Sequence, residues 1–183
     1  MTLYMVTRNA GKFEEARLEL SRFNIELRQI DADKLEVQSD DVVVIAARAA
    51  EAAYREFRVP LIVDDTGLFI NALNGFPGPY SSYVLRTIGL KGVLRLMSGI
   101  DDRSACFRTA VAYADDSGVK AFTGETCGRL ALSPRGSSGF GYDPIFIPQG
   151  ESRTYAEMDV GEKNRLSHRG KALRSFATWY VNR

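Results

Sequence analysis

The sequence is poor in the side chains that build soft-metal and redox sites. It contains one histidine, His168, and two cysteines, Cys106 and Cys127, which form no C-x-x-C pair. A zinc site needs three or four Cys, His or carboxylate ligands and a redox motif needs a closely spaced cysteine pair, so this composition argues against both. We expect Cys106 and Cys127 to be buried free thiols that pack as small apolar residues.

Neither sign of charge is in excess, and no apolar run is long enough for a membrane helix. The 24 Lys and Arg residues nearly balance the 23 Asp and Glu residues, whereas proteins that bind nucleic acids usually carry a basic patch. Residues 66–85 are uncharged, but glycines and prolines interrupt them. The first residues also lack the apolar core of a signal peptide. We therefore expect a soluble, cytoplasmic protein that binds neither nucleic acid nor membranes.

The length and the pattern of the chain indicate one mixed α/β domain that spans residues 1–183. A chain of 183 residues can bury a sizeable core without a disulfide or a metal. Short apolar runs and apolar residues at three- and four-residue spacing alternate along it. The predicted strands are residues 3–6, 25–30 and 61–63, and the predicted helices begin near residue 12, at a cap on Ser39 and at a cap on Ser167.

The second half of the chain predicts a long antiparallel hairpin followed by a loop. Residues 105–114 alternate between apolar and other side chains, so Phe107 and Thr109 share a face, and residues 119–126 return after a D-D-S-G turn. Residues 133–142 are rich in glycine, serine and proline, which predicts a loop.

The first candidate site is the loop between the first strand and the first helix. A helix N-terminus offers free backbone N–H groups and the positive end of the helix dipole, which suit a phosphate. Side chains add hydroxyl, amide and cationic groups to it. The candidate residues are Thr7, Arg8, Asn9, Ala10, Gly11 and Lys12. The structural alternative is that Asn9 only caps the helix and Lys12 is solvated.

The second candidate site is acidic. Five carboxylates lie between Asp31 and Asp41 against the single cation Lys34, and Asp64-Asp65 follows an apolar strand. Adjacent strand residues point to opposite faces, so only one of this aspartate pair can face a given cleft. Carboxylates with phosphate oxygens suit Mg²⁺, and the chain offers no soft ligands. The structural alternative is that these carboxylates only cap the next loop.

Two further segments could recognise a base. Residues 136–144 place Phe140 and Tyr142 in a glycine-rich loop, where the rings could stack on a planar base and Asp143 could accept a hydrogen bond. The alternative is a loop anchored in the core by these rings. Residues 163–174 contain five basic side chains and the histidine but no acidic residue. They form either a solvated helix face or a cluster of donors for a base carbonyl or phosphates.

Seven short motifs in this order resemble the inosine triphosphate pyrophosphatase family, the enzymes that hydrolyse non-canonical purine nucleoside triphosphates. The likeness covers nearly the whole chain. The motifs are T-x-N-x-x-K at 7–12, L-E-x-Q at 35–38, D-D-T-G-L at 64–68, G-x-P-G-P-Y-S at 75–81, F-x-G-x-x-x-G at 122–128, R-G-x-x-G-F-G-Y-D-P at 135–144 and E-K-N-x-x-S-H-R at 162–169.

The resemblance implies a fold, a reaction and a set of functional residues. The fold would be a long central mixed β-sheet flanked by helices, with two lobes around a nucleotide cleft. The reaction would be Mg²⁺-dependent hydrolysis of ITP, dITP and XTP to the monophosphate and pyrophosphate, by a homodimer that cleanses the nucleotide pool. Glu36 and Asp65 would bind the metal, and Asp65 would also orient or deprotonate water. The residues that would contact the nucleotide are the loop at 7–12, Thr66, Phe140, Gly141, Tyr142, Asp143, Lys163, His168 and Arg169.

Three positions depart from the family pattern, and two other functions stay open. Asp64 replaces a frequent Glu, Arg8 replaces a small residue, and Arg48 stands where a phosphate-contacting Lys is common. Arginine keeps the charge but has planar, bidentate geometry, so the role of Arg48 is open. The alternatives are a non-catalytic purine nucleotide sensor and a Mg²⁺-dependent phosphatase of another nucleotide class.

Overall fold

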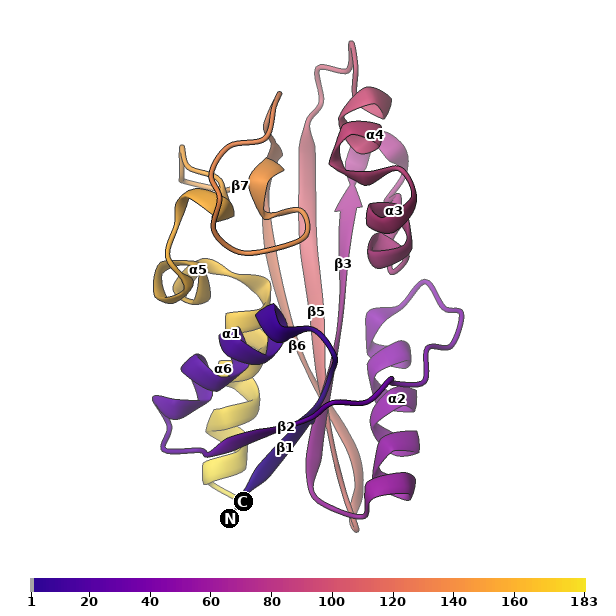
Figure 1. Cartoon of the computed structure of the whole chain (residues 1–183), viewed down its shortest axis with the longest axis vertical. Coiled ribbons are helices and arrows are strands. Elements are labelled where there is room, and N and C mark those ends of the chain that lie inside the picture. The colour runs from indigo at the N-terminus through magenta and orange to yellow at the C-terminus, as the bar shows by residue number, and fades with distance from the viewer. Residues whose placement is uncertain (1) are drawn as a thin grey trace.

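A long mixed β-sheet forms the centre of the protein, as shown by a computed structural model that describes residues 2–183 (Figure 1). The strand order is β2-β1-β3-β5-β6-β7, and β4 pairs with β3. Strand β1 is parallel to β2 and β3, and the remaining pairs are antiparallel. This confirms the predicted fold class. The strands are β1 (Leu3–Val6), β2 (Leu27–Ile30), β3 (Leu61–Ile70), β4 (Pro77–Gly78), β5 (Ser104–Asp115), β6 (Gly118–Leu130) and β7 (Phe146–Pro148).

Helices cover both faces of this sheet. Helices α1 and α6 pack on one face and α2 on the other, while α3 and α4 lie together toward the other end of the long strands (Figure 1). The helices are α1 (Ala10–Ser21), α2 (Val42–Phe57), α3 (Ser81–Thr87), α4 (Gly89–Leu96), α5 (Val160–Leu166) and α6 (His168–Val181). Among residues 2–183, none of the helices combines the length and the apolar character that a membrane crossing requires.

Three apolar clusters hold these layers together. On the face of α1 and α6, Ile62 and Val111 pack with Leu173 and Phe176. On the α2 face, alanines of the helix meet alanines of β5, which lets the helix lie close to the sheet. The third cluster, around Phe107, joins the far end of the sheet to the segments that carry β7 and α5.

Short polar side chains set the helix starts that position the site. The Asn9 side chain accepts from the Lys12 N–H and caps α1, and Ser167 caps α6, as predicted. The predicted cap at Ser39 is wrong by two residues, because Asp41 caps α2 while Ser39 accepts from the Asp41 N–H. Helix α2 therefore begins at Val42 despite three consecutive valines, because its apolar face is buried.

The strand predicted to end at Asp64-Asp65 continues to Ile70. Its parallel neighbour β1 is the strand that ends, at Val6, after pairing Met5 with Ile62. Beyond Ile62, β3 stays paired with its antiparallel neighbour β5 but is no longer paired with β1 on its other side. The two carboxylates therefore lie in mid-strand, beside the loop in which the chain leaves β1.

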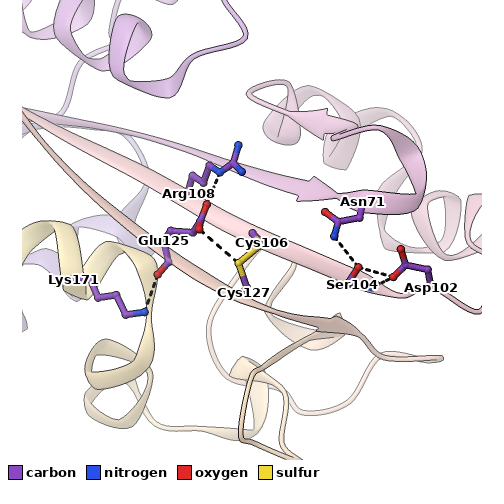
Figure 2. Close-up of a disulfide and its surroundings, with 8 residues drawn as sticks. All are labelled: Asn71, Asp102, Ser104, Cys106, Arg108, Glu125, Cys127 and Lys171. Carbon is purple, nitrogen blue, oxygen red and sulfur yellow. Dashed lines mark hydrogen bonds and ion pairs between the residues drawn. A yellow bond between two sulfur atoms is a disulfide. The ribbon is translucent and has the colours of Figure 1, made fainter.

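The expectation of two buried free thiols is wrong, because Cys106 and Cys127 form a disulfide across β5 and β6 (Figure 2). The two residues are directly paired in the hairpin, with Cα atoms 4.0 Å apart, and both are half-buried. Free cysteines are absent from the described chain. The residues are 21 positions apart in sequence, and only the register of the hairpin brings them together.

Loss of this disulfide should lower the stability of the fold. We expect Cys106→Ser, Cys127→Ser and the double variant to lose the same free energy of unfolding, about 2–4 kcal/mol, since each removes the same constraint on the unfolded chain. Urea unfolding with and without reductant measures the effect. Reductant should bring the wild type to the level of the variants and leave the variants unchanged. A wild-type urea midpoint that does not change when reductant is added would show that the disulfide is not formed.

Candidate active site

Six charged side chains from distant segments meet beside the first turns of α1. Two come from α1 itself and one from β3, while the others come from the 139–145 segment, α5 and α6. All are buried or nearly so. The six residues are Lys12, Glu15, Asp64, Asp143, Lys163 and Arg169. Because buried charges cost several kcal/mol each unless they are paired, the pairing within this group determines whether the site can fold at all.

Lys163 joins α1 to the glycine-rich loop. Its Nζ lies 2.5 Å from Glu15 Oε1 and 2.6 Å from Asp143 Oδ2. The same Asp143 oxygen accepts from the Phe140 N–H at 2.9 Å. Burial raises the pKa of Asp143 despite the nearby Lys163 ammonium. One lysine therefore fixes the position of the loop relative to α1.

Arg169 joins α6 to both α1 and the centre of the sheet. Its guanidinium donates to Glu15 Oε2 at 2.5 Å, to Asp64 Oδ2 at 2.9 Å and to Thr66 Oγ1 at 3.1 Å. Burial opposes the charge on Glu15, but Arg169 and Lys163 outweigh it and lower its pKa. The predicted acidic and basic segments thus meet at this arginine, together with a glutamate of α1.

Asp64 and Asp65 lie on opposite faces of β3, as predicted, and their environments push their pKa values apart. Burial opposes ionisation of Asp64, but Lys12, Arg169 and Lys34 overcome it and hold the pKa well below its usual range. For Asp65 burial prevails over the cations, so its pKa is raised. Neighbouring carboxyls with opposite shifts are typical of sites where one group carries permanent charge and the other exchanges a proton.

Asp65 retains a free oxygen. Its Oδ1 accepts from Lys34 Nζ at 2.7 Å, whereas its Oδ2 is buried and has no hydrogen-bond partner within residues 2–183. Lys34 also donates to the Asp64 carbonyl and lies 3.8 Å from Glu36, whose side chain is 66% exposed. The lysine thus lies near both predicted metal ligands, Glu36 and Asp65. A buried, unpartnered carboxylate oxygen fits a hard cation or a bound water.

The predicted phosphate loop matches its structural alternative at Asn9 but not at Lys12. Asn9 caps the helix and Thr7 Oγ1 accepts from the Asn9 N–H, so these side chains shape the loop. Lys12 is not solvated, because its ammonium lies 3.2 Å from Asp64 Oδ1. Burial lowers the pKa of Lys12, and Asp64 counteracts this. Arg8 lies outside the buried group, where it pairs with exposed Asp33.

The two aromatic residues of the glycine-rich loop take different roles. The Tyr142 side chain is buried in the core, where its hydroxyl donates to the Ser81 carbonyl, so the expectation that it stacks on a base is wrong for this arrangement. Burial also raises its pKa. Phe140 lies in the site, with Lys163 Nζ 4.6 Å from its ring centre. Gly141, with φ of 62°, lets the chain turn between the two rings.

A hollow of about 300 Å³ opens beside Phe140, between α1 and α5. Gly11 lines it, and a Cβ at that position would lie 2.3 Å from the Phe140 ring. The hollow also exposes edges of Glu15 and Lys163.

A second and larger hollow, of about 390 Å³, lies elsewhere, between α2 and the turn of the β5–β6 hairpin. Arg48 lines that second hollow and pairs with Glu51, so the structure places it outside the buried charged group.

His168 is held at the start of α6 by neighbours on β5. Its ring stacks on Phe107 with centroids 4.5 Å apart and planes inclined by 20°. Its Nδ1 lies 2.6 Å from Thr109 Oγ1. Burial, reinforced by the cations Arg169 and Lys163, lowers the pKa of His168 well below its usual value. The imidazole is therefore neutral at pH 7 and cannot serve as a cation.

Sequence reasoning identified most of this site and missed three of its members. Glu15 pairs with two cations, Lys34 holds Asp65, and Thr109 contacts His168. Glu15 follows Lys12 by three residues and so shares its helix face, which is a usable signal. Lys34 was the one cation among five carboxylates. For Thr109, only its place on the inward face of β5 was predictable.

Comparison with known proteins identifies the family to which this site belongs. The model of the Ham1 family matches residues 3–179. The chain belongs to the Ham1 family. Two curated relatives carry the name dITP/XTP pyrophosphatase. The one from Methanopyrus kandleri is 51% identical over 183 residues, covering 100% of this chain and 97% of its own. The one from Saccharolobus solfataricus is 52% identical over 173 residues, covering 94% and 90%.

Solved structures of Ham1 proteins share the whole fold. The HAM1 protein of Coxiella burnetii is 33% identical and superposes with a TM-score of 0.85 over 100% of both chains. The Ham1 protein of Staphylococcus aureus is 26% identical, with a TM-score of 0.83 over 99% of both chains. The long mixed sheet with its two groups of helices is therefore the Ham1 fold.

Proposed function

We propose that this Ham1 protein hydrolyses non-canonical purine nucleoside triphosphates, namely ITP, dITP and XTP, to the monophosphate and pyrophosphate. Two lines of support converge. Its full-length relatives are named dITP/XTP pyrophosphatases. The buried group also supplies cations suited to phosphates, and Asp65 on the neighbouring position of β3 supplies a carboxyl suited to water activation.

The observation that carries this proposal is the pair Asp64 and Asp65. Asp64 is a permanent anion that orients Lys12 and Arg169. Asp65, with its raised pKa and free Oδ2, can accept a proton from a water molecule at physiological pH. A protein that only bound nucleotides would not need a carboxyl with these properties.

Each remaining residue has a role that its position supports. Lys12 and the capped turn at residues 9–12 would hold the phosphates through charge and backbone N–H groups. Phe140 would pack against the base, with Lys163, His168 and Arg169 around it. Thr66 accepts from Arg169 and would position it toward the nucleotide.

Mg²⁺ is the proposed cofactor, and Asp65 with Glu36 would hold it. The donors fit, since both are hard oxygen ligands and Asp65 Oδ2 has no partner among residues 2–183. Bound Mg²⁺ would neutralise charge on the phosphate oxygens. Lys34, which donates to Asp65 and lies near Glu36, would orient the carboxylates.

The proposed homodimer has a candidate surface near α3. Four large apolar side chains are exposed within a short stretch of the chain, and α3 lies in it. They are Phe76, Tyr80, Tyr83 and Ile88. Sedimentation equilibrium gives the mass in solution and decides between monomer and dimer.

Product analysis tests the function directly. With ITP and Mg²⁺ we expect IMP and pyrophosphate, no orthophosphate, and a much slower reaction with ATP. A chelator should abolish turnover, and excess Mg²⁺ should restore it. Release of orthophosphate would favour a phosphatase of another class, and tight ITP binding without hydrolysis would favour a sensor. Glu36→Gln should raise the Mg²⁺ concentration needed for half-maximal activity.

A further inference from the structure

A chain of hydrogen bonds connects Arg169 to the ring of His168. Arg169 Nη2 lies 3.1 Å from Thr66 Oγ1, which lies 2.6 Å from Thr109 Oγ1, which lies 2.6 Å from His168 Nδ1. Thr109 and His168 are buried, at 0% and 2% exposed. Thr109 belongs to none of the seven sequence motifs, and the proposed function leaves it without a role.

The chemistry of the groups gives this chain a direction. An arginine guanidinium only donates, so Thr66 Oγ1 is an acceptor toward Arg169. The only other side-chain partner of that hydroxyl in the described structure is Thr109, so the Thr66 proton points to Thr109. Thr109 then accepts from Thr66, and its own proton points to the remaining partner, His168 Nδ1. Nδ1 is thereby an acceptor, and the ring proton lies on Nε2.

We infer that Thr109 is a positioning residue for base selectivity, because it holds His168 as the Nε2–H tautomer and makes that nitrogen a hydrogen-bond donor. The inference rests on the proposed function, in which His168 contacts the purine. Hypoxanthine and xanthine present a carbonyl at the six position, which accepts from such a donor. Adenine presents an amino group there, which meets it donor to donor.

The surrounding packing leaves the ring little freedom to escape this bond. Phe107 stacks on one face of the imidazole, and it is two residues before Thr109 on the same face of β5. Gly124 is the residue paired with Thr109 on β6, and a Cβ there would lie 2.1 Å from the His168 carbonyl oxygen. This glycine lets the start of α6 lie directly on the strands. The imidazole is neutral in this setting, so its tautomer determines which ring nitrogen donates.

The test uses the fact that the chain contains a single histidine. Protein labelled with ¹⁵N-histidine gives one pair of ring nitrogen signals, and their shifts and couplings show which nitrogen carries the proton. We expect a protonated Nε2 and a bare Nδ1 in the wild type, in Thr109→Ser, and in the control Thr126→Val. Thr126 is another buried β-strand threonine, and its hydroxyl donates to the Leu166 carbonyl instead. In Thr109→Val, which keeps the shape but not the hydroxyl, the Nδ1–H form should appear.

Kinetics then connect the tautomer to selectivity. The ratio of kcat/KM for ITP over ATP should fall roughly ten- to hundredfold in Thr109→Val and recover in Thr109→Ser. If Thr109 has a merely structural role, its replacement should lower kcat/KM for both substrates alike and leave the ratio unchanged. That result would overturn the inference. A wild-type ring protonated on Nδ1 would overturn it as well, even if Thr109→Val fails to fold. The spectra need no substrate, so they test the relay separately from the proposed hydrolysis.

Discussion

Asp65→Asn should lower kcat by roughly 10²–10⁴-fold while the affinity for ITP changes little. The amide keeps the shape of the side chain and the acceptor for Lys34, but it cannot take a proton from water or hold a cation by charge. Because burial raises the pKa of Asp65, the wild-type kcat should rise with pH as this carboxyl ionises. That acidic limb should be missing from the profile of the variant.

The control is a second aspartate variant far from the buried group. Asp116→Asn changes an exposed residue in the turn between β5 and β6 and should retain full turnover. Asp64→Asn is unsuitable, because Asp64 is buried and pairs with Lys12 and Arg169. Single-turnover assays with ITP separate chemistry from binding. An Asp65→Asn enzyme that keeps more than about a tenth of wild-type kcat would remove Asp65 from the role of base.

Arg169→Met should destabilise the fold by about 3–5 kcal/mol at pH 7, because it leaves two buried carboxylates without their shared cation. Glu15 keeps Lys163 and Asp64 keeps Lys12, so the rest of the buried group compensates only in part. The loss should depend on pH in a defined direction. The cations that surround Asp64 and Glu15 outweigh burial and lower both pKa values, so their stabilisation is present above the unfolded values and disappears as pH falls.

Urea unfolding across pH measures this effect. The difference between wild type and Arg169→Met should be largest at pH 7 and should shrink toward pH 4.5, the ordinary pKa of a glutamate, as the orphaned carboxyls take up protons. Arg174→Met is a matched control, since Arg174 also lies on α6 and pairs with a glutamate of α1, but is a third exposed. Arg174→Met should lower the free energy of unfolding by less than Arg169→Met does at every pH. A pH-independent difference for Arg169→Met would mean that lost packing, not charge, explains the loss.

The fold was predictable where the sequence carries periodicity, and less so where tertiary contacts decide. The strand at 3–6, the hairpin and the cap at Ser167 follow from local pattern, and the structure contains all three. The short helices α3 and α5 have too few turns to show a pattern, and the three- and four-residue spacing of Leu90, Val93 and Leu94 in α4 was missed. The disulfide, in contrast, could have been predicted from the sequence. The turn pairs Asp115 with Gly118, and counting nine residues away from the turn along each strand places Cys106 opposite Cys127.

The site shows the same division between chemistry and geometry. The residues named from phosphate and base chemistry, among them Lys12, Asp143, Lys163 and Arg169, do meet in the structure. Their partners were not predictable in the same way, because a buried glutamate such as Glu15 looks like any solvated helix carboxylate until the fold buries it. Tyr142 shows the converse, since an aromatic in a glycine-rich loop gives no sign of which way it points.

The ion pairs of the buried group also set the order in which the protein can become active. Glu15 contacts Lys163 and Arg169, which are 148 and 154 residues further along the chain. During synthesis, the N-terminal strands and α1 emerge long before the segment that neutralises this glutamate. A nascent chain that lacks α5 and α6 must therefore keep that carboxylate in water, with α1 undocked. The buried group, and with it the proposed site, is therefore complete only when the last helices have left the ribosome.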